Sequence, residues 1–175
     1  MDRVRAQLRA LTLSALACAC AEPARAVEAV AVLAGGASDL DELGAAVVTG
    51  LNARDEGALA ALTVTREEYT GPLFSALANH AGAEAMGREL LWDLHERQSR
   101  DDMARAVEDH GGRGWRYRRL EPRGVTRRTG VVFHERPVRV VEDERGDERR
   151  LQILASVVED EASHGFKLLG FRDHP

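Results

Sequence analysis

The sequence changes its pattern at Gly111 and Gly112, and this change sets the class of fold. Upstream, apolar residues recur at the spacing of amphipathic helices. Downstream, four short runs rich in Val, Ile, Phe, Tyr and Trp are typical of strands: WRYRRLEP, VVFHERPVRVVED, RRLQILASVVED and HGFKLLGFRD. Short connections join the last three runs and require antiparallel neighbours. The sequence therefore predicts an α+β fold, with N-terminal helices packed on an antiparallel sheet of four to five strands.

The first predicted helix begins near Ser38. Ser38 followed by Asp41 has the pattern of a capping box. Apolar residues then recur along one helical face. They are Leu40, Leu43, Val47, Val48 and Leu51. Asn52 or Asp55 offers the N-cap of a second, short, alanine-rich helix.

Two adjacent carboxylates, Glu67 and Glu68, stand beside Tyr69 in the segment LTVTREEYTGPLF. They form either a general acid/base cluster or the first turn of a helix. Thr65 and Glu68 have the capping-box spacing, and Glu67 lies where the helix dipole favours negative charge. We favour the helix start, and we expect the following Gly-Pro pair to stop or kink the helix.

A long helical stretch follows, from about residue 84 to residue 110. Ser99 with Asp102 offers an internal restart, so the stretch is either one helix or two. Gly111 and Gly112 are the expected stop.

Residues 1–26 have the order of features of a secretory signal peptide. Three arginines precede the apolar run ALTLSALACACA, and the small-x-small triplet Ala24-Arg25-Ala26 follows it. The run is too short to cross a bilayer as a stable helix. We interpret the chain as exported to the periplasm or cell envelope, with residues 27–37 as a linker and residues 38–175 as one α+β domain. The alternative is an amphipathic N-terminal helix packed on that domain.

Cys18 and Cys20 are the only cysteines, and both lie at the end of the apolar run. Cleavage after Ala26 would remove both, leaving a chain without a disulfide. The competing hypothesis is a lipoprotein acylated at Cys18 or Cys20, which is the only form in which we expect contact with a membrane. A Cys-x-Cys metal site would need further ligands, and no other cysteine exists.

Removal of residues 1–26, which hold two acids and four arginines, would change the formal charge from -5 to -7. An acidic protein lacks the positive field that a polyanion binder needs, so nucleic acid is not expected as a partner. One segment, RGWRYRRLEPRGVTRR, nevertheless places seven arginines around Trp115 and Tyr117. The alternation of aromatic residues with Arg116 and Arg118 favours a half-buried strand with a solvated face over an anion or headgroup site.

The stretch AAVVTGLNARDEGALAALT, followed by further helix and the C-terminal strands, resembles the nuclear-transport-factor-2-like, or SnoaL-like, superfamily. The resemblance covers about residues 38–172 and implies a curved sheet that wraps the helical layer into a cone with a pocket. With TREEYTGPL, LLWDLHERQSRDDM and GFKLLGFRD, the chain is also similar to a group of exported bacterial proteins without an assigned activity. The Asp-His pair of the superfamily's isomerases and dehydratases has no clear counterpart here, so their catalysis is not carried over.

Four residues are candidates for binding a ligand in such a cone: Tyr69, Trp92, His95 and His134. Trp92 and His95 lie three residues apart on the long helix and share a face; the alternative is a core aromatic residue and a surface histidine. His134 would face the cone interior if Val132 does. The sequence has no His-x-x-x-His pair, nucleophile elbow, phosphate-binding loop or dinucleotide fingerprint, so no catalytic residue, metal or cofactor is predicted.

We therefore expect an exported, non-enzymatic module that binds a small apolar ligand or a protein partner, with a homodimer through the sheet face as one arrangement. The alternative is a SnoaL-like enzyme that acts on a small hydrophobic substrate by acid/base catalysis, through His95 or His134 with Tyr69. Catalysis needs a histidine and a carboxylate within hydrogen-bond reach in a concave pocket. A third hypothesis, support of an envelope assembly, needs a filled interior and a large exposed apolar sheet face.

Overall fold

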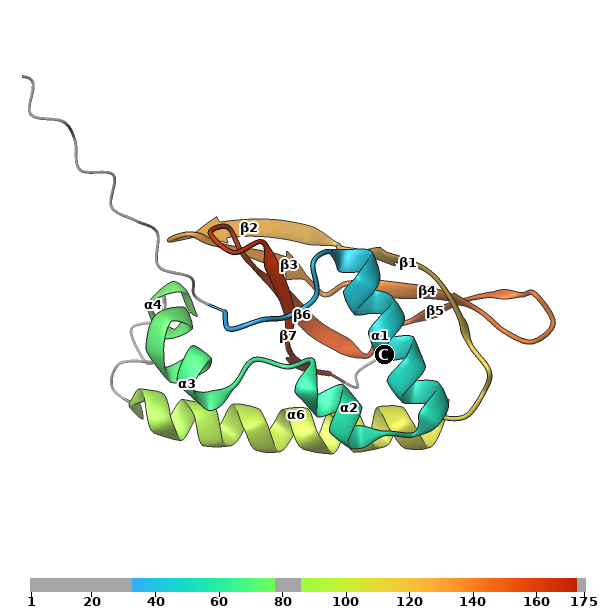
Figure 1. The fold of residues 1–175 in the computed structure, drawn as a ribbon. Helices are drawn as coiled ribbons and strands as arrows, with labels where there is room; N and C mark the ends of the chain where they lie inside the picture. The colour runs from blue at the N-terminus through green and yellow to red at the C-terminus, as the bar shows by residue number, and fades with distance from the viewer. Residues whose placement is uncertain (1–32, 78–85, 173–175) are drawn as a thin grey trace, which may run out of the picture.

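The fold consists of helices followed by antiparallel strands, so the predicted α+β class is confirmed (Figure 1). This computed structural model describes residues 33–77 and 86–172. The predicted signal peptide, both cysteines and the first six residues of the predicted linker lie outside these ranges. In Figure 1 the long helix α6 runs along one side of the molecule, below the strands in this view.

Helix α1 (Leu40–Ala53) begins one residue later than predicted. Asp39 is its N-cap and accepts a hydrogen bond from the Glu42 N–H at 2.7 Å. Glu42 Oε2 reaches back to the Ser38 N–H at 2.6 Å. The predicted capping pair, Ser38 with Asp41, is therefore wrong by one position, since Asp39 with Glu42 takes this role. The glutamate side chain is long enough to reach the backbone amide of Ser38, the residue before the cap.

Helix α2 (Glu56–Ala61) begins at Asp55, one of the two predicted caps. Asp55 Oδ1 accepts from the Ala58 N–H at 2.9 Å. Asn52 has a different role, because its side-chain amide exchanges two hydrogen bonds with the backbone of Trp115. Nδ2 donates to the carbonyl oxygen at 2.8 Å, and Oδ1 accepts from the N–H at 2.9 Å. The end of α1 is thereby tied to the residue that precedes the first strand.

The segment with two adjacent glutamates is a helix start, α3 (Arg66–Glu68). Thr65 and Glu68 form the predicted capping box: Glu68 Oε2 accepts from the Thr65 N–H at 2.7 Å, and Thr65 Oγ1 accepts from the Glu68 N–H at 3.3 Å. The chain continues through a π-helical turn, η1 (Tyr69–Leu73), into α4 (Phe74–Leu77). Gly71 has non-helical backbone angles (φ -92°, ψ -110°), so the Gly-Pro pair kinks the helix without ending it.

Helix α6 (Arg88–His110) is a single element of 23 residues. It continues through Ser99, where the sequence left a restart open, and it begins about four residues later than predicted. The predicted stop is confirmed, since Gly111 is the C-cap and its N–H donates to the Val107 carbonyl oxygen at 2.9 Å.

The described residues form more strands than the four or five predicted, and they form two sheets. The first sheet has the order β1-β4-β5 and the second the order β2-β3-β6-β7, with every pairing antiparallel. The strands are β1 (Arg116–Glu121), β2 (Gly124–Arg128), β3 (Val131–Glu135), β4 (Val138–Glu142), β5 (Glu148–Leu151), β6 (Leu154–Asp160) and β7 (Gly165–Phe171).

Two of the predicted runs are each divided between the sheets, which accounts for the higher number. VVFHERPVRVVED breaks at Arg136 and Pro137, because proline has no N–H to donate to a ladder and Arg136 adopts a positive φ of 42°. RRLQILASVVED breaks at Gln152 and Ile153. The pairing of β3 with β6 extends one residue further at the first break, where the Arg136 N–H donates to the Ala155 carbonyl oxygen at 3.1 Å. The chain therefore passes from one sheet to the other at each of these breaks.

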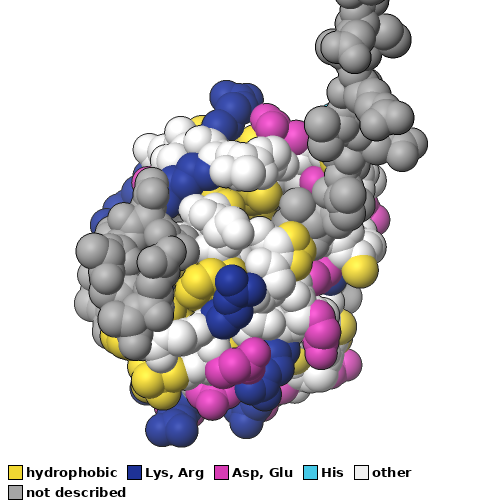
Figure 2. Space-filling model, turned by 90° about the vertical axis from the view of Figure 1, so that its left-hand side faces the viewer, with side chains coloured by type: hydrophobic (Ala, Val, Ile, Leu, Met, Phe, Trp, Pro, Cys, Tyr) yellow, Lys and Arg dark blue, Asp and Glu magenta, His cyan; other side chains and the backbone are white. Residues whose placement is uncertain are grey.

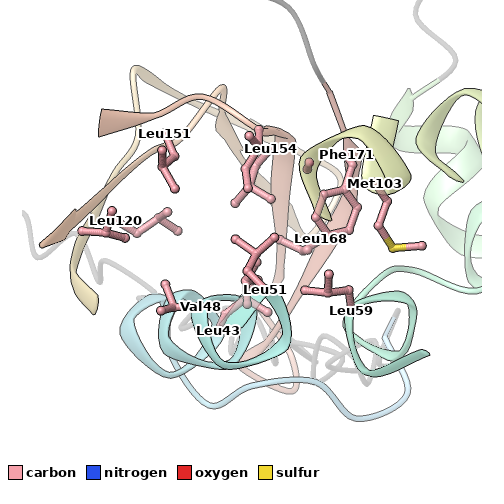
Figure 3. Packing of buried hydrophobic residues seen from close by; sticks show 14 of the residues in the cluster. Leu43, Val48, Leu51, Leu59, Met103, Leu120, Leu151, Leu154, Leu168 and Phe171 are labelled. Carbon is pink, nitrogen blue, oxygen red and sulfur yellow. The ribbon is translucent and has the colours of Figure 1, made fainter. Parts of the chain in front are cut away.

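The main core lies between the helices and both sheets. Figure 3 shows Leu43, Val48 and Leu51 of α1 facing Leu120 of β1 and Leu151 of β5. A second cluster lies on the other face of the four-stranded sheet and includes Leu73, Trp92, Phe133 and Val158. Neighbouring residues of β6 belong to different clusters, so this sheet is covered by apolar side chains on both faces.

The outer edge of β7 is covered by two other segments of the chain. Ala37 and Phe166 exchange two backbone hydrogen bonds, at 2.9 and 3.0 Å. Leu168 donates to Leu62 and accepts from Val64, each at 2.9 Å. Residues 33–37, predicted as the end of a linker, therefore pack against the domain. The otherwise open edge of the sheet is protected from pairing with another chain.

Candidate functional site

One face of α6 lies against the end of β7 and carries two of the predicted site residues. Trp92, His95, Ser99 and Met103 recur at helical spacing along this face. His95 Nε2 lies 2.7 Å from the Leu169 carbonyl oxygen, and Ser99 Oγ accepts from the Phe171 N–H at 3.0 Å. These two side chains attach the last strand to the helix.

Three of the four predicted site residues form a cluster of rings. Tyr69 stacks on His95 with a centroid distance of 5.0 Å and an interplanar angle of 17°. Trp92 lies 5.2 Å from Tyr69 and 6.0 Å from His95 between ring centroids. The expectation that Trp92 and His95 share a face is correct. Tyr69 joins them because it begins η1, which lies against α6.

Burial favours the uncharged forms of both titratable rings. Desolvation lowers the pKa of His95, and the carbonyl of Leu169 and the charge of Glu96 offset this only in part. Burial raises the pKa of Tyr69. Because a carbonyl oxygen only accepts, the His95 proton lies on Nε2 and Nδ1 is unprotonated at neutral pH. The cluster is therefore an uncharged aromatic surface near pH 7.

A half-open cleft of about 420 Å³ lies beside this cluster, between α6 and the connection from α2 to α3. The buried lining residues are apolar: Val64, Trp92 and Met103. Charged residues such as Arg66 and Arg100 lie at its exposed rim. The other lining residues are Ala60, Ala61, Thr63, Thr65, His95, Glu96, Ser99 and Leu169. The helical spacing of Ser99 and Met103 after Trp92 is a signal that could have identified them from the sequence.

His134 lies apart from the other three residues. It points to the opposite face of β3 from Phe133, which belongs to the cluster with Trp92. His134 Nε2 lies 2.9 Å from Glu159 Oε2, and the ring packs against Phe166 at 5.9 Å. His134 does share a face with Val132, as expected, but this face is not the one that borders the α6 cleft. The grouping of His134 with Tyr69, Trp92 and His95 is therefore corrected.

The lowered pKa of His95 predicts a pH dependence of stability. The unfolded chain takes up a proton near pH 6.5, before the folded chain does, so the free energy of unfolding should decrease as the pH falls from about 6.5. The decrease from this group is at most about 1.4 kcal/mol per pH unit. Urea unfolding at several pH values between 5 and 8 measures it.

His95→Gln is the informative variant, because a glutamine amide still donates to the Leu169 carbonyl oxygen but does not titrate. We expect a weaker pH dependence in this variant. The control is His164→Asn at an exposed position in the turn before β7, which should leave the wild-type pH dependence unchanged. Identical pH profiles for His95→Gln and the wild type would contradict the prediction.

The arginine-rich segment forms a strand with one solvated face, as the alternation indicated. Trp115 is buried, while Arg116 and Arg118 are exposed and both form ion pairs with Glu142. A bulge between Tyr117 and Arg119 shifts the register, so that the half-buried Tyr117 and the buried Leu120 both pack in the main core. Acidic neighbours thus offset much of the positive charge on this surface.

Large apolar side chains are exposed at two places among the described residues. Met86, Leu90 and Leu94 lie on or beside α6, and Val125 lies on β2. In the view of Figure 2 the hydrophobic side chains form small separate areas, with acidic and basic side chains intermixed below them. None of the described helices is both long and apolar enough to span a membrane. The described residues also contain no group of three or more His, Cys, Asp or Glu arranged to hold a metal ion.

These features define an α+β domain with a half-open cleft whose buried lining is apolar. No family model, curated protein or solved structure matches the chain. Its function is therefore inferred from the cleft itself.

Proposed function

We propose that the protein is a non-enzymatic module that binds a small apolar ligand in the α6 cleft. The observation that carries this proposal is the distribution of the lining residues, with apolar side chains where the cleft is deepest and charged ones at its rim. This is the usual character of a small-molecule site. Thr63, Ser99 and the unprotonated Nδ1 of His95 are the polar groups that would orient a ligand.

The alternative, an acid/base enzyme, has weaker support. His95 forms a hydrogen bond with a backbone carbonyl oxygen. Among the described residues, no carboxylate forms an ion pair with His95. His134 with Glu159 has the right chemistry, but neither residue lines the cleft. Acid/base catalysis would need both partners beside the substrate. We therefore prefer a binding role.

A neutral fluorescent probe, N-phenyl-1-naphthylamine, tests the proposal. We expect its fluorescence to rise on saturable binding to the wild-type protein. Ala61→Phe places a ring at the exposed edge of the cleft and should weaken binding at least about tenfold, a loss of roughly 1.4 kcal/mol. Ala58→Phe is the matched control, because Ala58 is exposed on the same helix but does not line the cleft. Equal affinities for the two variants, or no binding by the wild type, would refute the proposal.

We also propose, from the sequence alone, that the protein is a member of the nuclear-transport-factor-2-like superfamily that is exported to the periplasm or cell envelope. The intact mass of the protein from its own host distinguishes its forms. A chain that starts at Val27 would indicate a cleaved signal peptide, and an acylated Cys18 or Cys20 would indicate membrane tethering. An intact Met1 would contradict export.

A further inference from the structure

Arg139 of β4 places a charged side chain in the main core. Its exposed fraction is 0%, and its cross-strand neighbours are Leu120 of β1 and Leu151 of β5, which both belong to that core. None of its guanidinium nitrogens, neither Nε nor the two Nη atoms, has a hydrogen-bond partner among residues 33–77 and 86–172. Native proteins rarely bury a cation without a partner, because the lost hydration is not replaced.

The charge of Arg139 persists at neutral pH. Burial lowers its pKa to about 9, which still leaves the group protonated at pH 7. Among the described residues, Tyr117 is the group whose charge would favour the guanidinium, and burial raises the pKa of that phenol. Tyr117 is therefore neutral at pH 7, and the guanidinium has no negative partner in the part of the chain that the structure describes.

Tyr117 lies between the buried Arg139 and the protein surface. Its ring packs directly on α1 at Gly44, and its hydroxyl donates to Asp41 Oδ1 at 2.6 Å. Asp41 is exposed, and Tyr117 is half-buried. Tyr117 therefore borders the rim between α1 and β1 on the side that faces solvent.

We propose that Arg139 is the base of a binding site for a small carboxylate anion, which reaches the guanidinium past Tyr117 at the rim between α1 and β1. The planar fork of guanidinium N–H groups matches the two oxygens of a carboxylate. The flanking leucines suit a ligand whose remaining part is a short alkyl group. This site is separate from the α6 cleft, which Arg139 does not line.

Acetate and formate are the probes, and thermal unfolding of the full chain is the measurement. Each is titrated at constant ionic strength against sodium fluoride, with chloride as a third arm. We expect acetate or formate to raise the Tm of the wild type saturably, by about 3–6 °C at ten times Kd. Arg139→Met should lose this response and have a higher Tm than the wild type in fluoride, since it removes an uncompensated buried charge.

Two controls keep the test decisive. Arg145→Met removes an exposed arginine from the hairpin between β4 and β5 and should keep the acetate response. If Arg139→Met fails to fold, Arg139→Gln replaces it, and the ¹⁵Nε–¹H resonance of the buried guanidinium in the wild type should shift saturably with acetate. Equal Tm values in all four salts, a response to chloride alone, or an undiminished acetate response in the Arg139 variant would each overturn the proposal.

Discussion

Replacement of Glu68 by alanine should lower the free energy of unfolding by about 3–5 kcal/mol. Glu68 is buried, and its carboxylate accepts from Lys167 Nζ at 2.8 Å and from the N–H groups of Thr65 at 2.7 Å and Ala34 at 2.6 Å. It thereby joins α3, β7 and the segment before α1. Alanine would remove all three bonds and leave the buried Lys167 ammonium without its counter-ion. Urea unfolding at pH 7 measures the loss.

Glu67→Ala is the matched control, because it removes the same side chain from the adjacent, exposed position. We expect it to change stability by no more than about 0.5 kcal/mol. The double variant Glu68→Gln with Lys167→Met should be more stable than Glu68→Ala, since it removes both buried charges together. Similar losses for Glu67→Ala and Glu68→Ala would contradict the role of Glu68 as a buried link.

Glu68 should also make the stability of the folded protein sensitive to acid. Burial alone would raise the pKa of Glu68, but the hydrogen bonds from Lys167, Thr65 and Ala34 outweigh it and hold the pKa below its usual value. Its contribution to stability is therefore complete above about pH 4.5 and is lost as the pH falls through the folded-state pKa. Glu68→Ala should flatten this part of the stability profile.

Glu68 also illustrates how much of the fold could be predicted. Its capping box with Thr65 was predictable, because both partners lie within one turn of helix and the pattern is local. Its bond to Lys167 was not, since 99 residues separate the two side chains and only the position of β7 brings them together. The local pattern predicted the start of α3, whereas tertiary packing adds the ion pair between the same carboxylate and Lys167.

The candidate site likewise has one part that local sequence pattern predicts and one part that depends on tertiary packing. The common face of Trp92 and His95 follows from helical spacing alone. The contact of Tyr69 with both depends on how η1 packs against α6, which is a tertiary contact that no local pattern specifies. His134 was misplaced because alternation identifies which strand residues share a face, but not which face borders the cleft.

The sheets were the least predictable part, and Arg139 shows why. Val138 and Val140 alternate with Arg139 and Val141, so the pattern alone does not identify the inner face. The break at Pro137 places β4 in a different sheet from β3, and Arg139 then shares the core face with Val141. A proline within a strand run was the signal for a second strand.

Gly44→Ala should destabilise the domain by about 2 kcal/mol, although alanine is the better residue for a helix interior. A Cβ atom at Gly44 would lie 2.6 Å from both Cζ and Oη of Tyr117 and closer still to Cε2. The ring is held in place by its hydrogen bond to Asp41. Overpacking of this kind costs about 3 kcal/mol, which exceeds the gain of about 1 kcal/mol in helix propensity. Urea unfolding gives the net change.

Tyr117→Val isolates the cause, because valine removes the ring that the new methyl group would meet. In this background Gly44→Ala should become stabilising, by up to about 1 kcal/mol, so the sign of the effect should reverse. Gly57→Ala in α2 is the helical control, since its Cβ would approach only Asp55 Oδ1, at 3.3 Å. A stabilising effect of Gly44→Ala in the wild type would mean that Tyr117 does not pack closely on α1. Such a result would also remove the close contact at the rim that the proposed anion site uses.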